Sequence, residues 1–391
     1  MLLFVAALCG SCAGHGCRGK LVVDEAKKPE VQHGPTRTLP SPSLKNASAF
    51  ELVATSEGAL LIWAPDKCDN GLLLRRFDAY GVPLGEPVAL AACAGMDRLS
   101  EVTQVAAVAA GGKLGLAWIV RNEREAQAFG SFGEDSATSL AAALPLGAAE
   151  PARVPARAQL LLSGAETGQV RVELWAPTAA CTGQSGRCAQ VIASPLPPAR
   201  EAAARRTDGR EVPHPCPRLL VGSAWNHGIW YDAFCALDAE AGRPTTQVYA
   251  VRPEIFYAEA LPTLQGCTPL GVAPSERGVL VLGACQDGLY AHLLSEAHRS
   301  VLARIQRSLR CEAGRPILEI RSDAGGVESY KLSGPRDRIE LWLPETLAAE
   351  GSRAAFTGRS LLIATVQQQQ LVMSRQHCDG EALVSHTRTM L

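Results

Sequence analysis

The sequence lacks the linear motifs that assign a chemistry to a chain. It contains no Gly-x-Ser-x-Gly nucleophile elbow, no glycine-rich phosphate loop and no His-Glu-x-x-His zinc helix. Its eight histidines are dispersed along the chain, so they predict no metal site, and no cofactor is expected. These absences exclude the enzyme classes that a linear signature identifies, and they favour a protein without catalytic activity.

A net charge of either sign is also missing. Lysine and arginine number 38 against 39 acidic residues, which gives a formal net charge of −1. A balanced surface provides no general field for nucleic acid or for an anionic membrane, so neither is expected as a partner. The apolar run at the N-terminus is much shorter than the ~20 residues of a membrane-spanning helix, which argues against a transmembrane anchor.

Four tryptophans are the most informative feature that is present. Trp63, Trp118, Trp175 and Trp225 recur at intervals of 50 to 57 residues, and each ends a short apolar run. A period of this length, built from strands and turns without a helix in each unit, is typical of β-propeller blades. We therefore predict an all-β chain whose residues 47–391 form a propeller of seven blades, with six blades and an insertion as the alternative.

The N-terminal residues indicate export. Residues 1–17 combine an uncharged apolar run with small residues and cysteines, a pattern that resembles a bacterial lipoprotein signal peptide with Cys12 as the lipidated residue. An ordinary cleaved signal peptide is the alternative. Residues 18–46 are charged and contain several prolines, so they are expected to form a flexible tether. The protein is then an outer-membrane lipoprotein or a periplasmic or secreted protein.

Cysteine usage gives a second indication of export. Of 13 cysteines, three precede residue 18 and ten follow it, an even number that fits five disulfides in an oxidising compartment. Sequence neighbours suggest the pairs Cys68 with Cys93, Cys181 with Cys188, Cys216 with Cys235, and Cys267 with Cys285, which leaves Cys311 and Cys378 to link the last blades. The connectivity itself is left open by the sequence.

Acidic residues recur at predicted turns, at Asp78, Asp238 and Asp379. Aspartate at such a position caps a tight turn by accepting backbone N–H bonds, and we prefer this interpretation to a catalytic or calcium-binding role.

The densest aromatic cluster contains Trp225, His227, Trp230 and Tyr231, and it is the candidate ligand surface. Packing of these aromatic side chains between blades is the alternative interpretation.

One segment carries a family resemblance. The run Leu-Leu-Ile-Trp at residues 60–63 leads into Arg-Arg-Phe-Asp-Ala-Tyr-Gly-Val-Pro-Leu-Gly at residues 75–85. In this the chain resembles exported lipoproteins of high-GC bacteria with β-propeller-like repeats, a group without an assigned activity. The resemblance is specific around residues 58–90 and implies an architecture only.

Three functions remain open on these grounds. The first is a monomeric, non-catalytic scaffold of the cell envelope that recognises a protein or a glycan through propeller loops. The second is an extracellular polysaccharide hydrolase or lyase with carboxylates at the propeller channel, which would require two carboxylates within ~5 to 10 Å of each other. The third, by analogy of fold and location, is a component of envelope assembly.

Overall fold

The computed structural model describes most of the chain after residue 48. The described residues are 49–65, 71–90, 92, 100–123, 126–135, 144–146, 159–178, 188–196, 207–213, 220–237, 244–251, 258–264, 266–275, 278–294, 301–322, 330–332, 352–367 and 370–389. All of them belong to the second of two units, Met1–Leu39 and Pro40–Leu391. Residues 1–48, with Cys12 and the predicted tether, lie outside the described residues.

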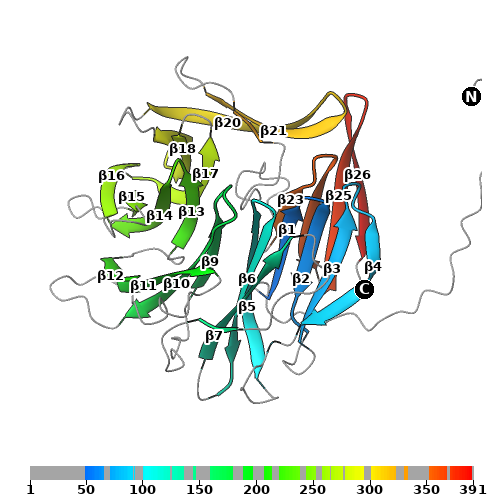
Figure 1. The fold of residues 1–391 in the computed structure, drawn as a ribbon. Coiled ribbons are helices and arrows are strands. Elements are labelled where there is room, and N and C mark those ends of the chain that lie inside the picture. Colours follow the sequence, from blue (N-terminus) through cyan, green and yellow to red (C-terminus); the bar gives the residue numbers. More distant parts are fainter. Residues whose placement is uncertain are drawn as a thin grey trace, which may run out of the picture. The chain divides into compact units, whose positions relative to one another are not determined.

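The described part is all-β, as the sequence predicts (Figure 1). Its ranges contain strands and turns and no helix. Nothing in these ranges has the length and hydrophobicity of a helix that spans a membrane.

Five sheets have four antiparallel strands each, and the strands follow one another along the chain. The first sheet is β1 (Phe50–Thr55), β2 (Gly58–Trp63), β3 (Leu72–Asp78) and β4 (Pro83–Leu90). The second is β5 (Glu101–Ala110), β6 (Lys113–Arg121), β7 (Ala126–Glu134) and β8 (Leu144–Pro145), and the third is β9 (Gln159–Gly164), β10 (Val170–Thr178), β11 (Cys188–Leu196) and β12 (Thr207–Pro213). The fourth is β13 (Leu220–Asn226), β14 (Ile229–Leu237), β15 (Pro244–Val251) and β16 (Ala258–Leu264), and the last is β23 (Arg353–Phe356), β24 (Ser360–Gln367), β25 (Gln370–Asp379) and β26 (Ala382–Thr389).

A larger sheet lies between the fourth and the last. It contains β17 (Thr268–Ser275), β18 (Gly278–Cys285), β19 (Gly288–Leu294), β20 (Val301–Glu312), β21 (Arg315–Ser322) and β22 (Tyr330–Leu332). The long strand β20 pairs with β19 through Val301–Arg304 and with β21 through Ile305–Glu312. The count is six sheets, or seven when the two parts of β20 are assigned separately. Residues 333–351 are outside the described ranges, so the number of blades stays a prediction.

The sheets are arranged radially as a β-propeller. The first strands of successive sheets contact one another in the order β1, β5, β9, β13 and β17, and β1 also contacts β23 of the last sheet. In Figure 1 the blue sheet β1–β4 accordingly lies beside the brown and red sheet β23–β26. Two sheets packed as a sandwich would not give this chain of neighbouring first strands.

The core lies between neighbouring sheets. One buried cluster joins Phe50 of the first sheet, Trp118 of the second and Leu362 of the last, and another joins Ile119 to Leu162 of the third sheet. All six residues of β2 are buried, because a strand within a blade packs against a neighbouring sheet on each face. This explains why such strands have continuous apolar runs instead of alternating polar and apolar residues.

Two disulfides are present in the described part, Cys267–Cys285 and Cys311–Cys378. Both pairings are those that the sequence suggests. Each of the other three suggested pairs includes a cysteine outside the described residues, at Cys68 and Cys93, at Cys181 or at Cys216. Disulfides of this kind are typical of an oxidising, extracellular environment.

The tryptophan repeat has one irregularity. Trp63, Trp118 and Trp175 lie on the second strands of their sheets, β2, β6 and β10. Trp225 instead lies on the first strand β13, one residue before its end, and its partner across the hairpin is Trp230 on the second strand β14. The fourth tryptophan therefore does not occupy the position of the other three, although the repeat length that it suggested is close to the spacing of the sheets.

Candidate functional site

The exposed turn between β3 and β4 is held by hydrogen bonds to an aspartate. Asp78 ends β3, and its Oδ1 accepts backbone N–H bonds from Tyr80 at 2.9 Å and from Val82 at 2.8 Å. Gly81 adopts a φ of 75°, a left-handed conformation that favours glycine. Asp78 thus caps the turn as predicted. Asp238 lies outside the described residues, and Asp379 ends β25 immediately before Gly380.

The last sheet fixes this turn from the other side. The Thr357 hydroxyl donates to the carbonyl oxygen of Ala79, and Arg375 Nη1 donates to the carbonyl oxygen of Tyr80 at 2.8 Å. At Gly81 a Cβ atom would lie 2.6 Å from Leu362 Cδ2, so the backbone approaches the last sheet closely. The main chain of the turn is therefore held by groups from both the first and the last sheet.

The side chains of the same segment face solvent. Tyr80 is 55% exposed, Val82 50%, Leu84 47% and Val88 52%. Among the described residues, one other large apolar side chain is exposed, Leu383 on β26. We call Tyr80, Val82, Leu84 and Val88 the turn surface. Four of the five exposed large apolar side chains of the described residues therefore lie within nine positions of one blade.

The strand β4 is protected against pairing with another strand. It is the outermost strand of its sheet, but it contains Pro83 and Pro87, which lack an N–H donor, and Gly85 with a φ of 74°. Its register with β3 also shifts between Leu74 and Arg76. Prolines and register shifts of this kind prevent the addition of a strand at an edge. The turn surface is therefore available for side-chain contacts and not for extension of the sheet.

The predicted aromatic cluster is packed between strands. Trp230 and Tyr231 are buried, Trp225 is half-buried, and the ring centroids of the two tryptophans are 4.8 Å apart. His227 is exposed in the hairpin turn with a φ of 46°. Of the four residues, His227 alone is exposed, and the three aromatic residues are buried or half-buried.

A buried charged cluster surrounds Trp230. Arg171 on β10 forms two hydrogen bonds of 3.1 Å with the carboxylate of Asp232 on β14, and it lies 2.8 Å from a carboxylate oxygen of Glu173. Ser223 donates a further hydrogen bond of 2.8 Å to Asp232, and the guanidinium is 5.6 Å from the centre of the Trp230 ring. The cluster joins the third and fourth sheets. The sequence did not predict this cluster, because Arg171 and Glu173 lie in one repeat and Asp232 lies in the next.

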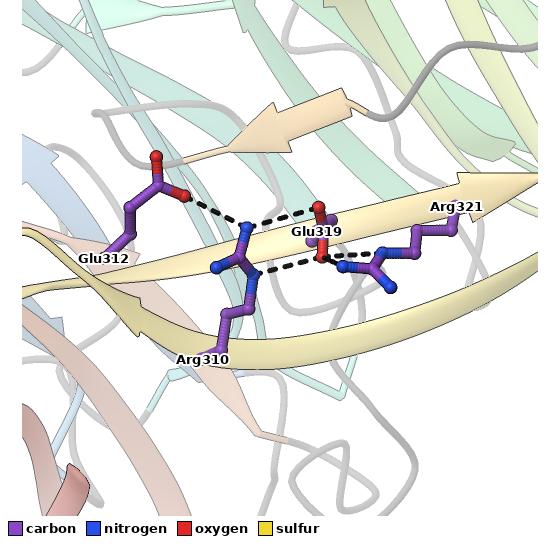
Figure 2. A network of polar contacts seen from close by, with 4 residues as sticks. All are labelled: Arg310, Glu312, Glu319 and Arg321. Carbon is purple, nitrogen blue, oxygen red and sulfur yellow. Dashed lines mark hydrogen bonds and ion pairs between the residues drawn. The ribbon is translucent and has the colours of Figure 1, made fainter. Parts of the chain in front are cut away.

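A second charged cluster is partly exposed on the hairpin of β20 and β21 (Figure 2). Arg310 bridges Glu312 and the buried Glu319, and Arg321 forms a second ion pair with Glu319 at 2.8 Å. Burial disfavours the charged carboxylate of Glu319, but the hydrogen bonds from Arg310 and Arg321 outweigh it and lower its pKa. The hydrogen bond with Glu319 raises the pKa of Arg310. Figure 2 shows all four side chains directed toward one another.

All four buried acidic side chains of the described part have partners. Asp135 accepts bonds of 2.8 Å from the N–H and the hydroxyl of Ser56, which lies in the first sheet's hairpin turn. Glu173 and Asp232 share Arg171, and Glu319 is bound by two arginines. Glu173 and Asp232 both contact Arg171, but they are 0% and 2% exposed. A polysaccharide would not reach them, so they do not supply the carboxylate pair that a glycosidase requires.

Comparisons with known proteins do not assign the chain to a family. No family model matches the chain, and no curated protein matches it. A proposed 6-phosphogluconolactonase of Bacteroides uniformis has 11% identity and a TM-score of 0.42, with 86% of this chain and 95% of that chain covered. Trypanosoma rangeli sialidase in complex with sialic acid has 8% identity and a TM-score of 0.37, with 85% and 59% covered, and the Dos1 propeller has 11% and 0.37, with 78% and 72% covered.

Similarities of this size carry no argument about activity, and this chain spans only about three fifths of the length of the sialidase. In the ranges that the structure describes, no group of three or more histidine, cysteine or acidic side chains is placed to hold a metal ion.

Proposed function

We propose that the protein is a non-catalytic binding scaffold of the cell envelope and that it recognises a protein partner through the turn surface. The observation that carries this proposal is the combination of exposed apolar side chains with a fixed main chain. Tyr80 and Val82 are about half exposed, whereas the backbone of residues 79–82 is bound by Asp78, Thr357 and Arg375. A surface that is ordered before binding loses little conformational freedom on binding.

The chemistry of the turn surface favours a protein over a glycan. Three of its four side chains, Val82, Leu84 and Val88, are aliphatic, and one is aromatic. Glycan sites need several polar groups that match hydroxyls, whereas aliphatic side chains around one tyrosine suit the apolar centre of a protein interface. The one pair of acids that shares an arginine, Glu173 and Asp232, is buried, which supports a scaffold instead of a hydrolase.

The compartment is part of the same proposal. The two disulfides are consistent with an oxidising environment. Lipidation at Cys12 and a tether over residues 18–46 would hold the propeller close to the outer membrane, where a protein partner of the envelope is accessible. The lipid anchor is tested by fractionation of cells that carry Cys12→Ala: the parent should remain with the membrane and the variant should become soluble, and a soluble parent would reject the anchor.

Site-specific photocrosslinking tests the binding surface in the bacterial envelope. A photoreactive amino acid placed at Leu84 should give a discrete protein adduct, whereas the same group at the exposed Ser308 of β20 should not. The adduct should disappear when Tyr80→Ser and Val82→Ser are added, since the apolar contact is lost. Unchanged circular dichroism and melting temperature would show that these surface substitutions leave the fold intact.

Two results would contradict the proposal. One is an adduct that persists with Tyr80→Ser and Val82→Ser. The other is an adduct with lipid alone, which would assign the turn surface to membrane contact.

A further inference from the structure

Two histidines contact each other on the last sheet. His377 is on β25 and His386 on the neighbouring strand β26. In the register of the two strands Arg375 is opposite His386 and His377 is opposite Val384. Residues opposite each other, and residues two apart on a strand, point to the same face. The imidazoles are therefore diagonal neighbours on one face, with ring centroids 5.1 Å apart and ring planes at 18°.

The two rings differ in their surroundings. His386 is exposed to solvent, whereas Nδ1 of His377 is buried, and within the described ranges no hydrogen-bond partner reaches that atom. Burial lowers the pKa of His377, and the nearby charge of Arg375 and the presence of His386 lower it further. These effects favour the neutral form of the ring over the imidazolium. A neutral imidazole has a free lone pair, which is the form that binds a metal ion.

We propose that His377 and His386 together bind one divalent transition-metal ion, with one nitrogen from each ring. Two imidazoles with metal–nitrogen distances of about 2.1 Å in a tetrahedral site have ring centroids about 5 Å apart, which agrees with the separation observed. To direct one nitrogen each at the same ion, the two rings must rotate about χ2, a torsion that is broad in histidine. Imidazole donors suit Zn²⁺, Ni²⁺ and Cu²⁺, and Cu²⁺ binds most tightly in this series.

The surroundings determine what kind of site this is. Cys378, adjacent to His377, is bonded to Cys311 and is unavailable as a ligand. Arg375 lies opposite His386 on the same face and brings a positive charge to the pair, and Asp379 lies two residues after His377. Water must complete the coordination, because no third histidine, cysteine or acid joins the pair among the described residues. The site on β25 and β26 would therefore bind an ion that exchanges with solvent, and it is not a structural metal centre.

Titration of the full chain, without an affinity tag, tests the site. Isothermal titration with CuCl₂ and NiCl₂ should show a site that His386→Gln weakens at least about tenfold, because one ligand of a chelate is lost. His377→Gln should weaken it similarly, and His227→Gln, which changes an isolated exposed histidine, should leave it unchanged. Nitrogen hyperfine structure in the Cu²⁺ electron paramagnetic resonance spectrum should diminish in both variants of the pair.

Either of two results overturns the proposal. The first is the absence of Cu²⁺ binding by the parent protein. The second is binding that is equal in the parent and in His386→Gln, since this would locate the ion elsewhere on the chain. His386 is exposed, so its substitution is not expected to disturb folding, and far-ultraviolet circular dichroism checks this directly.

Discussion

Two of the contacts between neighbouring sheets, here called joints, are formed by different kinds of interaction. Between the third and fourth sheets, Arg171, Glu173 and Asp232 form a buried charged cluster. Between the last and first sheets, Thr357 and Arg375 donate hydrogen bonds to backbone carbonyls of a solvent-facing turn. The first joint depends on charges that lack access to water, whereas the second depends on bonds at the surface.

The joint between the last and first sheets, here called the closing joint, differs from the others because its two sheets are far apart in the sequence. Each of the first and last sheets consists of consecutive strands from its own end of the chain, so contacts between side chains and backbone must close the ring. Arg353 adds an ion pair of 3.3 Å with Glu51 and lies 5.5 Å from the centre of the Phe50 ring. Bonds to the backbone of the turn leave its side chains free to face outward. The comparison suggests that the Arg171 joint serves stability and the closing joint serves presentation of a surface.

The largest effect is expected at the buried joint. Arg171→Met leaves the carboxylates of Glu173 and Asp232 buried without their main cationic partner, and removal of one member of a buried charged group costs about 3–5 kcal/mol. Urea unfolding followed by tryptophan fluorescence should show this loss. Adding Glu173→Gln and Asp232→Asn to Arg171→Met should recover part of it. A loss below about 1 kcal/mol would show that the cluster does not carry the joint.

A smaller effect is expected from the disulfide Cys311–Cys378, which links β20 to the last sheet across a sequence separation of 67. Replacing both cysteines by serine should reduce stability by about 2–4 kcal/mol, because the unfolded chain gains freedom. Hydrogen exchange should accelerate in β25 and β26 and stay unchanged in β10 and β14. The matched control is the double serine variant of Cys267–Cys285, which should leave exchange at the last sheet unaltered. If hydrogen exchange accelerated equally in β25 and β26 and in β10 and β14, the stability of the last sheet would not be separate from that of the Arg171 joint.

The sequence predicted the all-β propeller because its signal is local. Apolar runs such as residues 59–63 and 278–282 became strands β2 and β18, and the Asp78 turn follows from its own residues. The blade number was not fixed, because β20 pairs in two directions and such sharing has no local signature.

Contacts between repeats were beyond the reach of the sequence. Arg171 and Asp232 lie 61 positions apart and meet only when two sheets pack together. Trp230 was considered as part of a ligand surface, but its burial depends on that same packing. The histidine pair had a weaker signal, since His377 and His386 flank the turn at Gly380 in one hairpin. Reading the register outward from Gly380 would have placed both rings on one face.

The smallest effect on stability, and the most direct test of the closing joint, comes from Arg375→Met. The substitution removes the hydrogen bond to the Tyr80 carbonyl but retains an apolar stem against Gly81, so the loss should be about 1 kcal/mol. The substitution should affect hydrogen exchange in the turn more than it affects the global stability. The amides of Tyr80 and Val82 are protected by Asp78, and their exchange should accelerate once the turn is held from one side only. Arg315→Met, at an exposed arginine of β21, is the matched control and should leave these amides unchanged. If Arg375→Met also leaves their exchange unaltered, Asp78 alone orders the turn and the last sheet has no part in presenting the turn surface.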